Sequence, residues 1–132
     1  MVTAVDSSVL LDVVTNDPRW ADASEAGLRA AALQGSLIIS ESVLAEISPV
    51  VGTARMDEFL DDWNLRFVPS SRASALLAGR IFGQYLARGG KGGRIVPDFL
   101  IGAHARLHAD RLLARDRGYL RDYFKGLKVW SP

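Results

Sequence analysis

The 132-residue sequence predicts an α/β protein with one parallel β-sheet of about five short strands and helices on both faces. Two observations lead to this prediction. Short runs of β-branched and aliphatic residues alternate along the chain with longer stretches of helical periodicity, a pattern typical of parallel sheets. The composition, 48% hydrophobic and 23% charged, is too apolar for a disordered chain and contains no apolar stretch long enough to span a membrane.

The first third of the chain predicts a strand followed by two helices. Val2–Val5 is short and apolar and stops at Asp6, as a buried strand does. Ser7 is a suitable cap for a first helix that ends near residue 15. Pro18 suits the first position of a second helix, which Gly35 ends.

The middle of the chain predicts two further strands with two helices between them. Leu37–Ile39 forms the first of these strands, and Ser40 begins a helix that Pro49 limits or kinks. A helix over Thr53–Trp63 then leads to a strand at Leu65–Val68.

The last part of the chain begins with a long amphipathic helix over Ser71–Arg88. The glycine-rich, basic run at residues 89–94 predicts a loop, and Pro97 begins a helix that reaches Asp110. Leu112–Ala114 and Leu127–Trp130 are the last two predicted strands, with a short helix between them. Together these elements predict a single domain over residues 1–132.

The charges are divided unequally along the chain, although the formal net charge is only +1. Residues 1–66 hold eleven acids and four bases, a net charge of −7, and residues 67–132 hold four acids and twelve bases, a net charge of +8. Thirteen of the sixteen bases are arginine, whose planar fork suits phosphate groups, so a nucleic-acid partner is one interpretation. The absence of cysteine and of a basic, apolar leader predicts a cytoplasmic protein without a membrane partner.

Four acids are predicted to converge at the carboxyl edge of the sheet, where parallel α/β proteins bind ligands. Asp6 directly follows the first strand, and Asp116 follows the fourth. Asp98 lies at the start of a helix, and Glu46 lies on the helix that follows the second strand. Each has an ordinary alternative, as a helix cap or as a solvated surface acid. Capping alone does not explain an acid at every equivalent edge position.

Such a cluster of carboxylates repels itself unless a cation neutralises it. The donors are hard oxygens, so the predicted cofactor is Mg²⁺ or Mn²⁺. A metal in this place would activate a water molecule and offset charge on a phosphodiester. Either Asp98 or Asp116 could accept the proton of that water.

Four segments of the chain resemble PIN-domain nucleases, and within that family the VapC toxins of bacterial toxin–antitoxin pairs. The matching segments are Val5–Asp12, Ser42–Ile47, Pro97–Ala105 and Leu112–Arg117. They occur in the order typical of the family across nearly the whole chain. The resemblance implies a PIN-like fold, a homodimer, metal-dependent cleavage of RNA, and inhibition by a small cognate antitoxin protein.

The resemblance also assigns residues. It implies that Asp6, Glu46, Asp98 and Asp116 are the catalytic and metal-binding acids, with Ser7 supporting the first of them. The sequence departs from the family at Ala114, where Thr or Ser is frequent, and at Gly118, where an acid or Asn is frequent. The basic second half is expected to bind RNA, and the bases expected nearest the acids are Lys91, Arg94, Arg115 and Arg117.

Other functions are compatible with parts of this pattern. A PIN-fold nuclease that processes RNA without acting as a toxin, or an inactive fold that binds nucleic acid or protein, would keep the same elements. A receiver-like phosphoryl-transfer domain would also place acids at a sheet edge, but here Asp6 is followed by Ser7 and Ser8 rather than by a second acid. His104 and His108 have the spacing of a zinc pair, with no third ligand nearby in the sequence.

Overall fold

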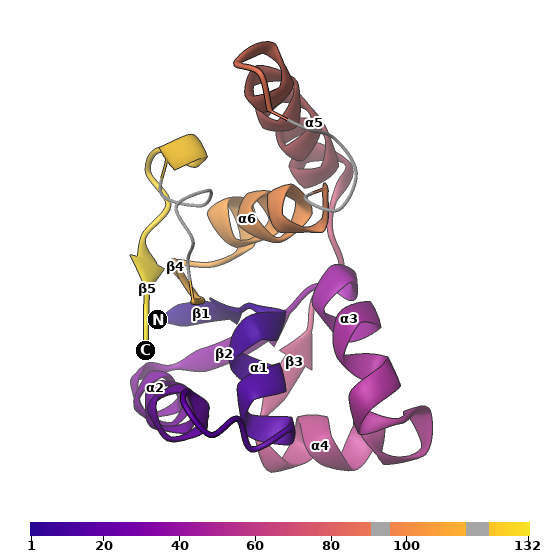
Figure 1. Cartoon of the computed structure of the whole chain (residues 1–132), viewed down its shortest axis with the longest axis vertical. Helices are drawn as coiled ribbons and strands as arrows, with labels where there is room; N and C mark the ends of the chain where they lie inside the picture. Colours follow the sequence, from indigo (N-terminus) through magenta and orange to yellow (C-terminus); the bar gives the residue numbers. More distant parts are fainter. Residues whose placement is uncertain (91–95, 116–121) are drawn as a thin grey trace.

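A computed structural model describes residues 1–90, 96–115 and 122–132 of the chain, and these residues form the predicted α/β fold. Five parallel strands make one sheet in the order β3-β2-β1-β4-β5 (Figure 1). The strands are β1 Val2–Val5, β2 Ser36–Ile39, β3 Leu65–Phe67, β4 Arg111–Leu113 and β5 Val129–Trp130. All five predicted strands are therefore present, each within two residues of its predicted bounds.

Side chains on the central strands are buried on both faces, which explains why these strands are continuous apolar runs. In β1, Ala4 pairs with Ile38 of β2 on one side and with Leu112 of β4 on the other. All three residues are almost completely buried. A strand without a solvent-facing side needs no polar alternation, as is usual for parallel sheets.

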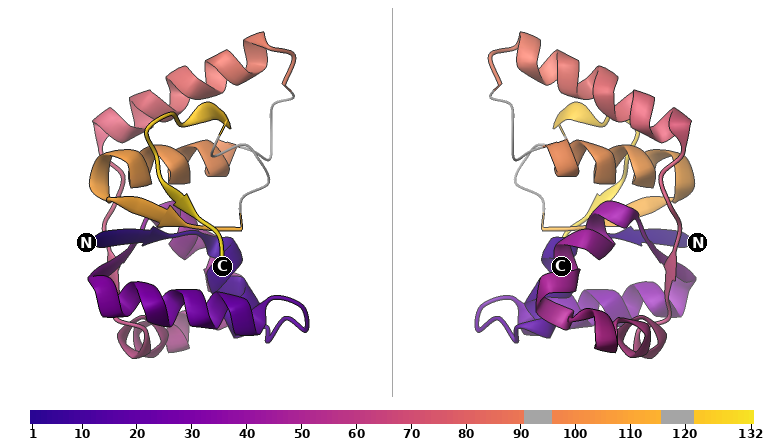
Figure 2. Two further views of the ribbon diagram at one scale, coloured as in Figure 1. Left: turned by 90° about the vertical axis from the view of Figure 1, so that its left-hand side faces the viewer. Right: turned by 90° about the vertical axis from the view of Figure 1, so that its right-hand side faces the viewer.

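Helices cover both faces of the sheet. Helix α6 lies on one face with α5 stacked outside it, and α1 and α2 cover the opposite face (Figures 1 and 2). The helices are α1 Ser7–Val14, α2 Ala21–Gln34, α3 Glu41–Val51, the 3₁₀ turn η1 Thr53–Arg55, α4 Met56–Asp62, α5 Arg72–Ala87 and α6 Val96–His108.

The predicted starts of the first two helices were wrong, and both corrections involve an aspartate. Asp6, not Ser7, is the cap of α1, because its side chain accepts a hydrogen bond from the backbone N–H of Ser8. The second helix begins at Ala21 rather than at Pro18. The carboxylate of Asp17 accepts the two backbone N–H groups that follow Pro18, which forms a separate turn before the helix.

The single helix predicted over Thr53–Trp63 is divided into η1 and α4. The preceding helix α3 runs through Pro49 and ends at Gly52, which adopts a positive φ of 85°. That left-handed conformation suits glycine and turns the chain before η1 begins.

No helix in residues 1–90, 96–115 and 122–132 is long and apolar enough to cross a membrane.

The two glycines of α5 have open space beside them. A Cβ atom added at Gly79 or Gly83 would meet nothing within 4 Å. These glycines therefore do not serve close packing within the described part of the chain.

Candidate functional site

The strand order changes direction at β1, which is flanked by β2 and β4. At such a switch point the loops that leave neighbouring strands separate and open a crevice beyond the carboxyl ends. Asp6 lies at this point, and its backbone N–H donates to the carbonyl oxygen of Leu113 at 2.9 Å. The first predicted acid is thus fixed between β1 and β4 by a ladder-type hydrogen bond.

The Asp6 carboxylate is held by its own helix cap. Oδ2 of Asp6 accepts hydrogen bonds from the backbone N–H and the hydroxyl group of Ser8, at 3.2 and 2.5 Å. Burial nevertheless raises the pKa of Asp6, against the opposing effect of these hydrogen bonds and the charge of Arg115. The ordinary interpretation of Asp6 as a cap is therefore correct, and its carboxylate is also poorly solvated.

Glu46 lies close to Asp6, although it is on a different helix. The hydroxyl group of Ser7 donates to Oε1 of Glu46 at 3.1 Å, which connects the start of α1 to α3. Desolvation of its carboxyl group raises the pKa of Glu46, and the negative charges of Asp6 and Asp98 raise it further. Asp6 and Asp98 are therefore each near enough to Glu46 for their charges to act on it.

Asp98 is positioned by the first turn of α6. A carboxylate in a first turn interacts favourably with the positive end of the helix dipole. The next residue, Phe99, is buried at 1% exposure and contacts the rings of Phe82 and Tyr85. This packing fixes the rotation of the helix about its axis while Asp98 itself remains partly exposed.

The fourth predicted acid, Asp116, lies outside the described residues, as do Lys91, Arg94 and Arg117. Arg115 directly precedes Asp116, and its backbone N–H donates to the hydroxyl oxygen of Ser8 at 3.2 Å. The same hydroxyl group donates to Asp6. Ser8 therefore connects the Asp6 carboxylate to the backbone of Arg115, the residue before Asp116.

Arg115 also forms an ion pair that the sequence reasoning did not anticipate. Its Nε and one terminal nitrogen donate to the two carboxylate oxygens of Asp12, at 2.7 and 2.9 Å. Ser24 donates a third hydrogen bond to that carboxylate, and the indole ring of Trp20 lies 5.0 Å from the Arg115 guanidinium. The structure therefore gives Arg115 a role in holding α1, through Asp12, against the end of β4. The RNA contact predicted for Arg115 stays a prediction.

A signal for the pair was present in the sequence. Asp12 interrupts an otherwise apolar helix, and a buried acid on an apolar face requires a partner. Its distance of 103 residues from Arg115 along the chain concealed which base that partner is.

The two histidines of α6 contact the segment between β3 and α5. His104 is buried, and its Nε2–H donates to the carbonyl oxygen of Val68 at 2.7 Å. His108 contacts the hydroxyl group of Ser71 at 3.2 Å. Because Ser71 caps α5 and Val68 directly follows β3, both contacts help to set the position of the helix that carries Asp98.

The buried imidazole gives a testable pH dependence. Burial lowers the pKa of His104, so the folded protein takes up this proton less readily than the unfolded chain does. Its contribution to the free energy of unfolding is complete above the ordinary value of 6.5 and is lost as the pH falls below it. We expect urea unfolding to report a decline in stability between about pH 6.5 and 5, and we expect that decline to be smaller in His104→Gln. Equal slopes in the two proteins would assign the decline to other groups.

The donor set fits a hard divalent cation. Asp6, Glu46 and Asp98 would supply carboxylate oxygens. Burial raises the pKa of Glu46 most, and the charges of Asp6 and Asp98 raise it further, a repulsion that a cation would relieve. Within the described ranges, no three His, Asp or Glu side chains lie together as a group that could hold a metal ion. A complete set therefore needs water, a phosphate oxygen or an acid beyond those ranges, as magnesium sites that keep several waters commonly do.

Comparison with known proteins agrees with this architecture. A family model described as the PIN domain matches residues 3–125. The chain therefore belongs to the PIN domain family, whose nucleases are hydrolases that act on nucleic acids. No curated protein sequence matches significantly.

Solved structures resemble the whole chain at low sequence identity. VapBC2 from Rickettsia felis, bound to a DNA fragment from its promoter, superposes with a TM-score of 0.77 at 20% identity, over 100% of this chain and 99% of that one. DNA-bound VapBC from Salmonella typhimurium has a TM-score of 0.72 at 15% identity and covers 99% of this chain and 98% of its own. FitAcB from Neisseria gonorrhoeae has a TM-score of 0.70 at 18% identity and covers 97% and 96%. At these identities the likeness establishes the fold.

Proposed function

We propose that the chain is a VapC-type toxin, a metal-dependent endoribonuclease that hydrolyses RNA phosphodiester bonds. One observation carries this proposal. Ser7, which follows Asp6 at the switch point of the sheet, donates a hydrogen bond to Glu46 of α3, and the charges of Asp6 and of Asp98 on α6 both act on that glutamate. A fold that needed these acids only as caps or as solvated surface groups would have no reason to bring them together.

Mg²⁺ or Mn²⁺ is the proposed cofactor, held by Asp6, Glu46, Asp98 and Asp116. When bound there, such an ion would lower the pKa of a coordinated water and offset negative charge on the phosphodiester. Ser8 fixes the orientation of Asp6, and Ser7 fixes that of Glu46, by the hydrogen bonds described above. Preorganised ligands of this kind lose little entropy on binding a cation.

The proposed partner is a small antitoxin protein, and the proposed active form is a homodimer. The superposing structures from Rickettsia felis and Salmonella typhimurium are VapBC complexes, which supports a two-protein system. A growing cell would need such a partner because an uninhibited ribonuclease would degrade the RNA of that cell.

Growth tests the toxin role. We expect expression of the chain alone to arrest growth of a bacterial host, and co-expression of a small protein encoded beside it to restore growth. The Asp98→Asn variant, expressed at the same level, should be harmless. Normal growth with soluble wild-type protein that still cleaves RNA in vitro would instead indicate an RNA-processing nuclease without a toxin role. Normal growth without cleavage would indicate a binding module.

A further inference from the structure

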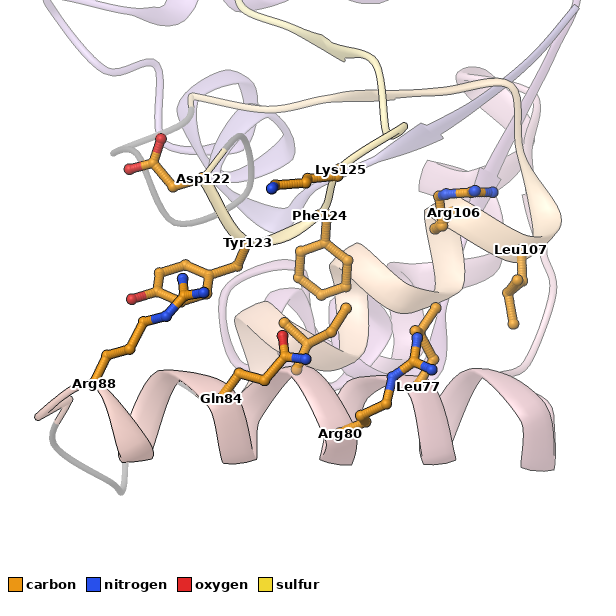
Figure 3. A pocket seen from close by; sticks show the side chains of 11 residues that line it. Leu77, Arg80, Gln84, Arg88, Arg106, Leu107, Asp122, Tyr123, Phe124 and Lys125 are labelled. Carbon is orange, nitrogen blue, oxygen red and sulfur yellow. The ribbon is translucent and has the colours of Figure 1, made fainter.

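A groove with an excess of positive charge lies on the outer side of α6. It has a volume of about 490 Å³ and lies between α5, the C-terminal end of α6 and residues 122–125 (Figure 3). Four bases line it and one acid does. The bases are Arg80, Arg88, Arg106 and Lys125, and the acid is Asp122.

None of the four bases of the groove has an ion-pair partner among the described residues, which is also true of exposed arginines elsewhere such as Arg55 and Arg66. Arg29 pairs with Glu25, and Arg115 pairs with Asp12. Neither Arg80 nor Arg106 has a comparable carboxylate. What sets the groove apart is that four bases share it with one acid, Asp122, and such an excess of like charge raises the local positive potential and attracts an anionic ligand.

The spacing of the bases suits a polymer of regularly spaced charges better than a single anion. Arg80 and Gln84 of α5 and Arg88, the residue that caps this helix, follow one another at intervals of four residues and line the groove (Figure 3). A helix rises 1.5 Å per residue, so the two arginines are separated by about 12 Å along its axis, with an amide group midway. Arg106 and Lys125 line the opposite wall.

Local packing prepares two of these guanidinium groups. The Arg88 guanidinium lies over the ring of Tyr123, at 5.6 Å from its centre, which leaves the edge of its fork free to donate. Gly126 has a positive φ of 85°, and a Cβ atom there would come within 3.3 Å of Arg106 Nε. Glycine at this turn therefore leaves the space that the Arg106 side chain occupies.

The groove and the candidate site share one helix. Asp98 in the first turn of α6 and Arg106 in its last turn are eight residues apart, about 12 Å along the axis. One strand of nucleic acid is long enough to contact both.

We propose that this groove binds the phosphate backbone of the RNA substrate. The bound segment would position the adjoining part of the same strand, which holds the bond to be cleaved, near Asp98. The inference rests on the proposed ribonuclease function and names the surface that binds its substrate. Arginine forks donate to phosphate oxygens in pairs, so the three arginines of the groove suit this ligand.

The test measures binding of a fluorescent single-stranded RNA by anisotropy, in the Asp98→Asn background so that the strand stays intact. We expect Arg80→Gln/Arg88→Gln to weaken binding about tenfold or more. We also expect the slope of log affinity against log salt to become shallower by about 1.4, since each lost phosphate contact of a single strand contributes about 0.7. Arg106→Gln/Lys125→Gln, on the other wall, should act in the same direction.

A matched control removes the same charge elsewhere. Arg55→Gln/Arg66→Gln loses two exposed arginines of η1 and of β3, the strand at the opposite edge of the sheet, and should leave the affinity within about twofold. If both groove variants bind RNA like this control, with an unchanged slope, the groove proposal is wrong while the ribonuclease proposal stands. If a labelled polyglutamate peptide, and not RNA, loses affinity in the groove variants, the groove binds acidic protein and the proposal is overturned. If wild-type protein neither binds nor cleaves RNA, both proposals fail.

Discussion

Replacement of Asp98 with asparagine is expected to lower the rate of RNA cleavage by at least about a hundredfold while leaving the fold intact. The substitution keeps the shape of the side chain and removes one negative charge. Replacing a residue that only hydrogen-bonds to a metal ligand typically lowers metal affinity or activity ten- to a hundredfold. Loss of a ligand itself should lower activity at least as much. A gel assay with labelled RNA, run with Mg²⁺ and with a chelator, measures the effect.

Stability distinguishes this role from a purely structural one. The loss of a first-turn carboxylate costs about 0.3–1 kcal/mol through the helix dipole, and relief of repulsion with Glu46 acts in the opposite direction. We therefore expect the metal-free Asp98→Asn protein to lie within about 1 kcal/mol of wild type. Mg²⁺ at 100 times its dissociation constant should stabilise wild type by about 2.7 kcal/mol and the variant much less.

A matched control for this substitution is Asp22→Asn, which removes an exposed carboxylate from the first turn of α2. It has the same chemistry and the same helix position, but it lies on α2 rather than on a helix that carries one of the predicted acids. The control protein should cleave RNA like wild type. Full cleavage by Asp98→Asn would remove this residue from the site.

The largest expected loss of stability comes from breaking the buried ion pair between Asp12 and Arg115. Asp12→Asn leaves the Arg115 guanidinium without its charge partner, at a side-chain exposure of 26%. Removal of one member of a buried pair typically costs about 3–5 kcal/mol, and the partial exposure of Arg115 places the expected cost near the lower value. Urea unfolding monitored by circular dichroism measures it.

Two comparisons make this second prediction specific to the buried pair. Glu25→Gln breaks the exposed pair with Arg29 and should cost no more than about 0.5 kcal/mol. The double replacement Asp12→Leu/Arg115→Met removes both charges and should recover part of the stability lost in Asp12→Asn. Equal small effects of Asp12→Asn and Glu25→Gln would mean that the buried pair does not stabilise the fold.

The strands were predictable because each is a short apolar run that the parallel sheet buries on both faces. β1 and β2 show this most clearly, since residues such as Ala4 and Ile38 have no solvent-facing side to produce alternation. The helix starts were harder because capping depends on which side chain reaches a free N–H group. Asp6 performs that role in place of the predicted Ser7. Asp17 accepts the N–H groups of Arg19 and Trp20 in a turn, and the second helix begins after this turn rather than at Pro18.

The candidate site was predictable in part for a related reason. Asp6 directly follows β1, so topology alone predicts its place at the carboxyl edge of the sheet. Glu46 and Asp98 lie on helices, and the role of the three acids as metal ligands stays a prediction. The connection through Ser8 and the pairing of Asp12 with Arg115 could not be predicted, because both join residues more than 100 positions apart. Such contacts depend on side-chain geometry at the junction of β1 and β4, which no local pattern encodes.

Binding of Mn²⁺ tests most directly whether the converging acids form a metal site. The paramagnetic resonance signal of the free ion falls as it binds protein, so a titration gives an affinity without any nucleic acid present. We expect wild type and Asp22→Asn to bind Mn²⁺ equally, and Asp98→Asn to bind it at least about tenfold more weakly. Equal Mn²⁺ affinity in all three proteins, or no binding by wild type at millimolar Mn²⁺, would contradict the proposed site.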